Sequence, residues 1–545
     1  MAIIRGVIGK YSQKHNVYSR LRLPPVGIMS VLSQIADKYG VHAIDENNYG
    51  ERNDDNNLPD HAHLQEIDPV KIVLLYGGMT NSIPRIFDLA RQYKKMGVIT
   101  VVGGNHVDAM PEEALRQGVD VVVHGEGEQI IQDLVPALLE GKDLENIVGL
   151  SFIKDGNMIF TGRRDPIENL DSLIDTDLDL FKYTAKRWSS IPVNMGRGCN
   201  YCCEFCVVND QLGKYRRSSP EKTFRQVKKH AEQGYKSFFI TDDNFAQNPE
   251  AAIELCKKIG DYKRAEKKKI NLIAQVRTEA AKDDRLIDAM RYAGIMTLCI
   301  GYESPINEEL SAMKKGVTVE MMLQRSRKLS KDFLIHCMMI FDYPVLKDSK
   351  YKTLISLKEK AKRYKKFIKD SKITTLQLFN TVPIPGTKLR RKLEEEDRIL
   401  SLEYVNWDKY DGMFLCHKPD EFDPYEAQHT PKEILSWKYR GGFFNRNFNQ
   451  YNWINWANNF TFGYIINHIV AFGKRMAENS KNPGSLMHQR NLFVDSWEAA
   501  KADVKRKIKA LKLNTGAAFI LNGWQEEYNK IEFDSILQLM KDRTI

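Results

Sequence analysis

The sequence predicts an α/β protein with an N-terminal parallel-sheet domain, then a partial (β/α) barrel, then a mostly helical C-terminal region. Strand-like and helix-like segments alternate in two separate series, and this alternation stops near residue 390. The length of 545 residues is also too great for one ordinary core. We therefore expect a first domain over 1–150, a linker over 151–190, the barrel over 191–390 and the C-terminal region over 391–545.

The first series has its glycines where the predicted strands end. "KIVLLYGG", "ITVVGG" and "DVVVHGEGE" are typical of buried strands, and amphipathic segments typical of helices separate them. Such βαβ units form a parallel sheet, and ligands bind outside the carboxyl ends of its strands. No G-x-G-x-x-G phosphate fingerprint is present, so simple turns are the alternative explanation for these glycines.

The second series predicts six strands separated by helices. The strand-like segments are "IPVNMG", "SFFITDDNF", "INLIAQVR", "MTLCIGYES", "FLIHCMMIFDYP" and "TTLQLFNTVPIPG". Units of this length favour a complete or partial (β/α) barrel, whose active site lies at the carboxyl ends of the strands. The C-terminal region that follows is aromatic and lacks this alternation.

Bulk composition predicts a soluble, cytoplasmic protein. Hydrophobic residues make up 42% and charged residues 28% of the chain. The N-terminus has no apolar signal-peptide core, and no apolar run approaches the roughly 20 residues that span a bilayer. The net charge of +10 is spread widely, as on solvated helix faces, so we expect no nucleic-acid partner.

Half of the eight cysteines lie in one short loop after the first predicted barrel strand. Cys199, Cys203 and Cys206 have CxxxCxxC spacing, and Cys202 falls outside it as a bystander. Structural zinc needs a fourth ligand, usually from a second cysteine knuckle, and no CxxC lies outside this loop. An iron–sulfur cluster held by three thiolates would leave one iron open, and Phe205 would pack beside it. The spacing therefore favours a cluster with Cys199, Cys203 and Cys206 as metal ligands and catalytic residues.

This motif, in this position, resembles the radical SAM superfamily, whose signature is CxxxCxφC with an aromatic φ. The resemblance implies a 4Fe-4S cluster at which S-adenosylmethionine (SAM) is reductively cleaved to a 5′-deoxyadenosyl radical. It also implies an electron donor such as flavodoxin or ferredoxin. Five residues at strand ends match the family's SAM contacts, although their charges are also compatible with salt bridges at the barrel mouth: Asp243, Gln275, Arg277, Gly301 and Glu303.

Residues 20–415 further resemble the B12-binding subgroup, which sets a Rossmann-like cobalamin domain before a barrel of radical SAM type. The similar segments include "VVGGNHVDAMPEEALRQGVDVVVHGEGE" and "VPIPGTKLRRKLEEEDRI". The chain lacks DxHxxG, so the implied cobalamin has no His lower ligand. The residues implied to contact it are Tyr76, Thr80, Gly103, Gly104, Gly125, Glu126 and Gly127.

The resemblance implies a cobalamin-dependent methyltransferase acting on an unactivated carbon. The alternative is a radical SAM enzyme that carries out cyclisation, carbon–carbon coupling or oxidation without methyl transfer, similar to the anaerobic Mg-protoporphyrin ester cyclase or to lipid-modifying enzymes. An RNA methylthiotransferase is disfavoured because no cysteine precedes Cys199, and a non-catalytic sensor because the triad is complete.

The expected substrate is a small or lipid-like molecule. The aromatic segment Trp453–Arg475 ends in basic residues, so peripheral contact with a membrane is a further hypothesis. A helix packed on the protein's own core is the more common origin of such a pattern.

Overall fold

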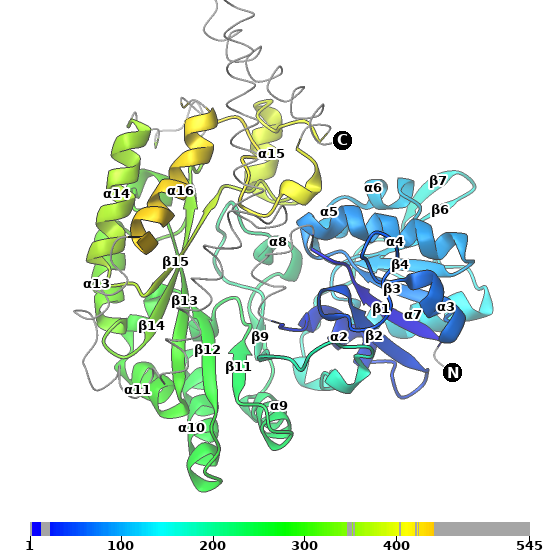
Figure 1. Ribbon diagram of the computed structural model, residues 1–545. Helices are drawn as coiled ribbons and strands as arrows, with labels where there is room; N and C mark the ends of the chain where they lie inside the picture. Colours follow the sequence, from blue (N-terminus) through cyan, green and yellow to red (C-terminus); the bar gives the residue numbers. More distant parts are fainter. Residues whose placement is uncertain are drawn as a thin grey trace, which may run out of the picture.

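The computed structural model describes residues 3–11, 22–345, 351, 355–402, 405–419, 422 and 424–440. Within them the chain forms two α/β bodies that lie side by side (Figure 1). The predicted α/β architecture is confirmed. The segment Trp453–Arg475 lies outside the described residues.

The first body is built on a seven-stranded sheet with the order β2-β1-β3-β4-β5-β6-β7. Strands β1 to β5 are parallel, whereas β6 and β7 are antiparallel additions at one edge. These last two strands lie in the segment that was expected to be a linker, so the sheet continues past residue 150. The strands are β1 (Ile4–Ile8), β2 (Val41–Asp45), β3 (Ile72–Tyr76), β4 (Ile99–Gly103), β5 (Val121–Val123), β6 (Leu150–Lys154) and β7 (Asn157–Phe160).

The inner strand β1 was not predicted, because its sequence "IRGVI" contains a charge and a glycine. Arg5 is fully buried and donates to His42 Nε2 and Tyr93 Oη, both at 2.9 Å, and to two backbone carbonyls. A Cβ at Gly6 would lie 2.5 Å from Leu32 Cδ1. Partners distant in sequence therefore satisfy the charge, and glycine allows a helix to pack closely on the strand.

Helices cover both faces of this sheet. One face packs on α2 (Val26–Ser33) and α7 (Gly127–Glu140), and the other on α4 (Ile83–Lys95) and α6 (Pro111–Arg116). Two short helices complete this body: α3 (His61–Ile67) and α5 (Asn105–Ala109).

The second body contains a six-stranded, all-parallel sheet whose spatial order follows the sequence, as in a partial barrel. All six strands were predicted: β8 (Ile191–Val193), β11 (Ser237–Ile240), β12 (Asn271–Val276), β13 (Ile295–Glu303), β14 (Leu334–Phe341) and β15 (Thr375–Asn380). The connecting helices are α9 (Pro220–Glu232), α10 (Pro249–Ala265), α11 (Asp284–Ala293), α12 (Asn307–Ala312), α13 (Val319–Leu329) and α14 (Leu357–Asp370). Three further helices are α8 (Val208–Leu212), α15 (Lys388–Glu395) and α16 (Pro424–Arg440).

The segment after the barrel joins the two bodies. Trp407 and Tyr410 are buried in the same apolar cluster as Val7 and Val107 of the first body. The Trp407 indole donates to Glu113 Oε1 at 2.8 Å. This part of the predicted C-terminal region therefore packs against the first body, while α16 lies along α14 and β15 (Figure 1).

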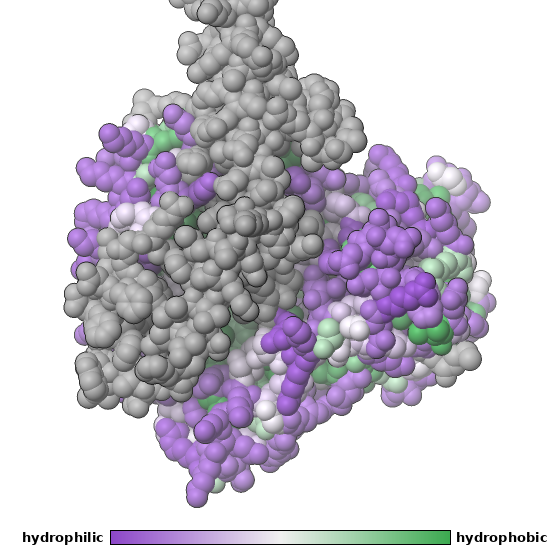
Figure 2. Space-filling view, in the orientation of Figure 1, coloured by the Kyte–Doolittle hydropathy of each residue, from purple (hydrophilic) through white to green (hydrophobic). Residues whose placement is uncertain are grey.

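Hydrophilic side chains dominate the described surface in the view of Figure 2. Across the described ranges, no helix is both long and apolar enough to cross a membrane.

We expect Trp407→Ala to lower the free energy of unfolding by about 3–5 kcal/mol, because it empties a buried site between the two bodies and leaves Glu113 without its indole donor. Urea unfolding followed by circular dichroism measures this change. Ile67→Ala is the control, since Ile67 is 56% exposed and its loss is expected to cost under about 0.5 kcal/mol. Equal losses in the two variants would contradict the packing role of Trp407.

Candidate functional site

The cysteine loop is closed at its base by a short antiparallel ladder. Strand β9 (Gly196–Arg197) leads into the loop and β10 (Arg216–Arg217) leads out of it, with Arg197 opposite Arg216. Gly198 has φ +78°, and a Cβ there would lie 2.6 Å from the Lys214 carbonyl oxygen. The residue before Cys199 must therefore be glycine for the ladder to form.

Asp242, at the carboxyl end of β11, anchors the turn before the loop. Its carboxylate accepts from the backbone N–H groups of Met195 and Gly196, both at 2.8 Å, and the residue is 1% exposed. Burial raises the pKa of Asp242 to about 7, although the two backbone donors lower it. Sequence reasoning placed Asp242 in a strand-end motif and did not identify this positioning role.

The three thiols of the predicted triad are free and half-buried, whereas Cys202 is exposed, with Sγ 3.6 Å from Asn209 Oδ1. Burial, together with smaller contributions from the nearby Cys203 and Cys199 thiols, raises the pKa of Cys206 to about 12. Bound cations would remove this penalty by stabilising the thiolates. Among the described residues, no three His, Cys, Asp or Glu side chains converge on one metal ion. A multinuclear cluster fits better, because each thiolate can bind a different iron.

Phe205 packs into a small apolar cluster at the carboxyl end of the barrel. Its ring meets that of Tyr343 edge to face, with centroids 6.4 Å apart, and Met313 and Leu389 belong to the same cluster. The carboxylate oxygens of Glu204 form ion pairs with Lys314 Nζ at 2.9 Å and with Lys392 Nζ at 2.7 Å. These two neighbouring side chains fasten the middle of the cysteine loop to the barrel.

The predicted SAM contacts on β11 and β12 come together beside the loop. Gln275 Nε2 donates to the Asp243 carbonyl at 3.3 Å, and burial raises the pKa of the Asp243 carboxyl to about 6. The Arg277 guanidinium lies 3.9 Å from Cys203 Sγ and 3.7 Å from the centre of the Tyr201 ring. The cluster loop therefore has a fixed cation and a buried carboxyl group beside it.

The predicted contacts on β13 form a second, strained part of the site. Glu303 has φ +63°, lies at a register shift and pairs with Lys315 at 2.7 Å. A Cβ at Gly301 would lie 2.3 Å from Glu303 Oε1, so glycine leaves room for this carboxylate. Strain of this kind persists where the surrounding structure enforces it, often at ligand sites.

The predicted cobalamin edge of the first body has a backbone cradle made of glycines. A Cβ at Gly104, which has φ +129°, would lie 2.5 Å from the Gly78 nitrogen. Gly125 has φ +70°, and a Cβ there would meet nothing within 4 Å. Tyr76 and Gly103 end the adjacent strands β3 and β4 at the same edge. Backbone atoms without Cβ groups therefore line part of this edge, which is compatible with the close approach of a large planar ligand.

Two imidazoles lie at this edge within the described ranges, and both are engaged inside the protein. His106 contacts Thr80 Oγ1 at 3.3 Å through Nδ1, and His124 bonds Asp108 at 2.6 Å and Ser151 at 2.8 Å. The hydroxyl of Thr80, a predicted cofactor contact, therefore contacts the His106 ring. The arrangement agrees with a cobalamin site that has no His lower ligand.

Glu126, another predicted cofactor contact, bonds the barrel instead. Its two carboxylate oxygens form ion pairs with the guanidinium groups of Arg197 at 2.9 Å and Arg216 at 2.7 Å. Arg197 also bonds Glu128 at 2.6 Å, and Gly127 begins α7 between the two carboxylates. We call these four charged side chains, Glu126, Glu128, Arg197 and Arg216, the interdomain latch. Sequence reasoning missed the role of both arginines.

A second contact links the cysteine loop to the same edge, because Gln211 Nε2 in α8 donates to the Asn105 carbonyl at 2.8 Å.

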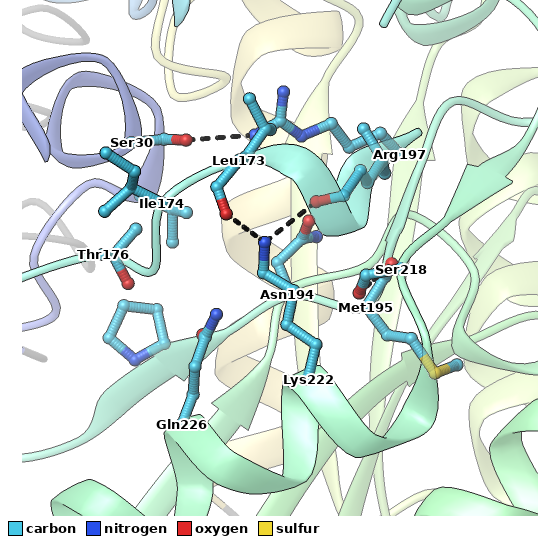
Figure 3. A pocket seen from close by; sticks show the side chains of 13 residues that line it. Ser30, Leu173, Ile174, Thr176, Asn194, Met195, Arg197, Ser218, Lys222 and Gln226 are labelled. Atoms are coloured by element: carbon cyan, nitrogen blue, oxygen red, sulfur yellow. Dashed lines mark hydrogen bonds between the residues drawn. The ribbon is translucent and has the colours of Figure 1, made fainter. Parts of the chain in front are cut away.

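Beside Arg197 of the latch lies a cavity of about 40 Å³, which Ser30 and Lys222 also help to line (Figure 3). Its lining residues come from both bodies, so the cavity belongs to the interface between them.

Known proteins match both bodies. Residues 193–357 match the radical SAM superfamily, and residues 17–135 match the B12 binding domain. An uncharacterized methyltransferase of Pyrococcus horikoshii is 28% identical over 71% of this chain and 81% of its own length. The anaerobic magnesium-protoporphyrin IX monomethyl ester cyclase of Rubrivivax gelatinosus is 25% identical over 65% of this chain and 62% of its own length.

The fold also matches the radical S-adenosylmethionine methyltransferase TsrM of Kitasatospora setae, solved with cobalamin and a [4Fe-4S] cluster. The TM-score is 0.60 at 16% identity, over 82% of this chain and 90% of that one. At this identity the likeness concerns the fold.

We expect Cys203→Ala to abolish cluster binding, and Cys202→Ala to leave it intact, because only Cys203 belongs to the triad. Iron and sulfide content after anaerobic reconstitution, with electron paramagnetic resonance of the reduced protein, measures both variants. Loss of the cluster in Cys202→Ala would show that the ligand set differs from the predicted one.

Proposed function

Because the chain is a radical SAM protein that carries a B12-binding domain before its barrel, we propose that it is a cobalamin-dependent methyltransferase acting on an unactivated carbon. The observation that carries this proposal is the contact between the two predicted cofactor sites. Glu126 follows β5 of the first body and bonds both strands that close the cysteine loop. The similarity to a methyltransferase over most of both chains supports the same assignment.

When bound, the cluster and SAM supply a 5′-deoxyadenosyl radical and cobalamin supplies a methyl group. The chain's own residues hold these groups and their charges. Cys199, Cys203 and Cys206 provide three thiolate ligands. Arg277 presents a fixed cation suited to the SAM carboxylate, and Asp243 presents a carboxyl group suited to its ammonium.

Glu303 completes the proposed SAM site. Lys315 holds one of its oxygens at 2.7 Å, and the residue is 8% exposed, so its carboxylate keeps one orientation. A fixed carboxylate of this kind suits the ribose hydroxyls or the SAM ammonium. Burial of these groups also keeps water from the place where a reactive radical would form.

On the other side, Tyr76, Gly103, Gly104 and Gly125 are proposed to line the cobalamin site, with Thr80 supporting it through His106. Glycine backbone would allow the corrin ring close approach, since Cβ atoms are absent there. The lower face would contact the protein without an imidazole ligand, because the two histidines at this edge bond other residues.

The substrate is proposed to be a small molecule, and the electron donor a flavodoxin or ferredoxin in the cytoplasm. The alternative activity is cyclisation, coupling or oxidation without methyl transfer. The similarity to the magnesium-protoporphyrin ester cyclase supports this alternative, although the chain spans less than two thirds of the length of that enzyme.

We expect anaerobic protein, reconstituted with iron, sulfide and cobalamin, to form 5′-deoxyadenosine and S-adenosylhomocysteine together when given SAM, a strong reductant and cell extract. Both products are quantified by mass spectrometry, with Cys203→Ala as the control. Deoxyadenosine alone would assign the cyclisation, coupling or oxidation alternative. Formation of neither product by a cluster-loaded enzyme would contradict the proposed activity.

A further inference from the structure

We propose that Glu126 couples the two cofactor sites, so that occupation of the cobalamin edge stabilises the cysteine loop and the reverse. The inference rests on the proposed function, since it requires that both sites bind their cofactors. It assigns Glu126 and the interdomain latch a positioning role, in place of the direct cofactor contact expected from the sequence.

Glu126 lies on the first body, in the turn that follows β5. It lies between Gly125, whose φ is +70°, and Gly127, the first residue of α7. This turn follows β5 at the edge where a ligand would bind. A ligand that orders the turn therefore also orders the Glu126 side chain.

The Glu126 carboxylate accepts hydrogen bonds from both strands that close the cysteine loop. Arg197 and Arg216 are directly opposite each other in the ladder that closes the cysteine loop. The Ile167 N–H donates to the same carboxylate at 2.7 Å. Cys199 lies two residues beyond Arg197, and its N–H donates to the Gly213 carbonyl at 3.2 Å. Glu126 therefore holds both strands of the hairpin from which the cluster ligands project.

Burial strengthens the ion pairs of the interdomain latch. The side chains of Glu126, Glu128 and Arg216 are 4–8% exposed and that of Arg197 is 16% exposed. Charges in such surroundings are weakly screened by solvent and salt. The latch holds two positive and two negative groups, so replacing any one of them by a neutral residue leaves a net charge among the other three.

Linkage makes the coupling measurable. If cluster binding fixes the hairpin and the hairpin fixes Glu126, the cluster must tighten cobalamin binding by the factor by which cobalamin tightens cluster binding. Typical coupling between two sites in one protein is 5-fold to about 150-fold. If Glu126 instead contacted cobalamin directly, replacing Glu126 would weaken cobalamin binding equally with and without the cluster.

The experiment compares the Kd for hydroxocobalamin of the full chain with and without its reconstituted cluster. We expect the cluster to tighten binding by at least about fivefold in the wild type and in the control Glu145→Gln, which alters an exposed pair with Lys154. In Glu126→Gln the ratio is expected to fall to about one. A second variant, Glu126→Gln with Arg216→Gln, keeps the charge balance and the pair between Arg197 and Glu128, so it tests the coupling without an unpaired buried charge.

Hydrogen exchange of the cluster-free protein gives an independent readout. Hydroxocobalamin is expected to slow amide exchange across residues 196–217 in the wild type and not in the double variant. A ratio of about one in the wild type, or an unchanged ratio in both Glu126 variants, would overturn the coupling. Absence of cobalamin binding by the wild type would contradict the proposed function itself.

Discussion

The geometry of the candidate site depends on one buried carboxylate that is shared by two arginines. Glu126 reaches from the first body to Arg197 and Arg216, which close the cysteine loop. Buried ion pairs gain little over apolar packing, but removing one partner costs about 3–5 kcal/mol because the other charge stays buried. Glu128 supplies the second negative charge and balances the set. The latch therefore specifies how the two bodies are arranged more than it stabilises either of them.

Parallel sheets impose the second constraint, because the carboxyl ends of all their strands lie at one edge. In the first body this edge carries the glycines after β4 and β5, and in the barrel it carries the cysteine loop, Asp243 and Glu303. Backbone groups and polar side chains gather there without competing with the core. Docking the bodies through Glu126 and through Gln211 brings the two edges into contact.

Local patterns in the sequence were sufficient to predict the barrel strands and to single out a candidate cysteine triad, because apolar runs and Cys spacing lie within a few residues. They were insufficient for β1, since Arg5 and Gly6 interrupt its apolar pattern and their partners come from distant segments. The latch was missed for the same reason. Glu126 is 71 residues from Arg197 and 90 residues from Arg216, and each side chain alone resembles an ordinary surface charge. The strand-end position of Glu126 was predicted correctly, but its partner depends on how the two bodies dock.

The same reasoning explains why neither histidine at the cobalamin edge is available as a lower ligand. Burial lowers the pKa of His106, and the ring packs edge to face on Trp407 with centroids 4.7 Å apart. His124 bonds Asp108, whose carboxylate also receives Arg163 at 2.6 Å. To turn either imidazole outward would leave these buried partners unsatisfied, at about 1–3 kcal/mol for each lost hydrogen bond. Trp407 comes from the segment after the barrel, so one of these histidines is held in place by the docking of the two bodies.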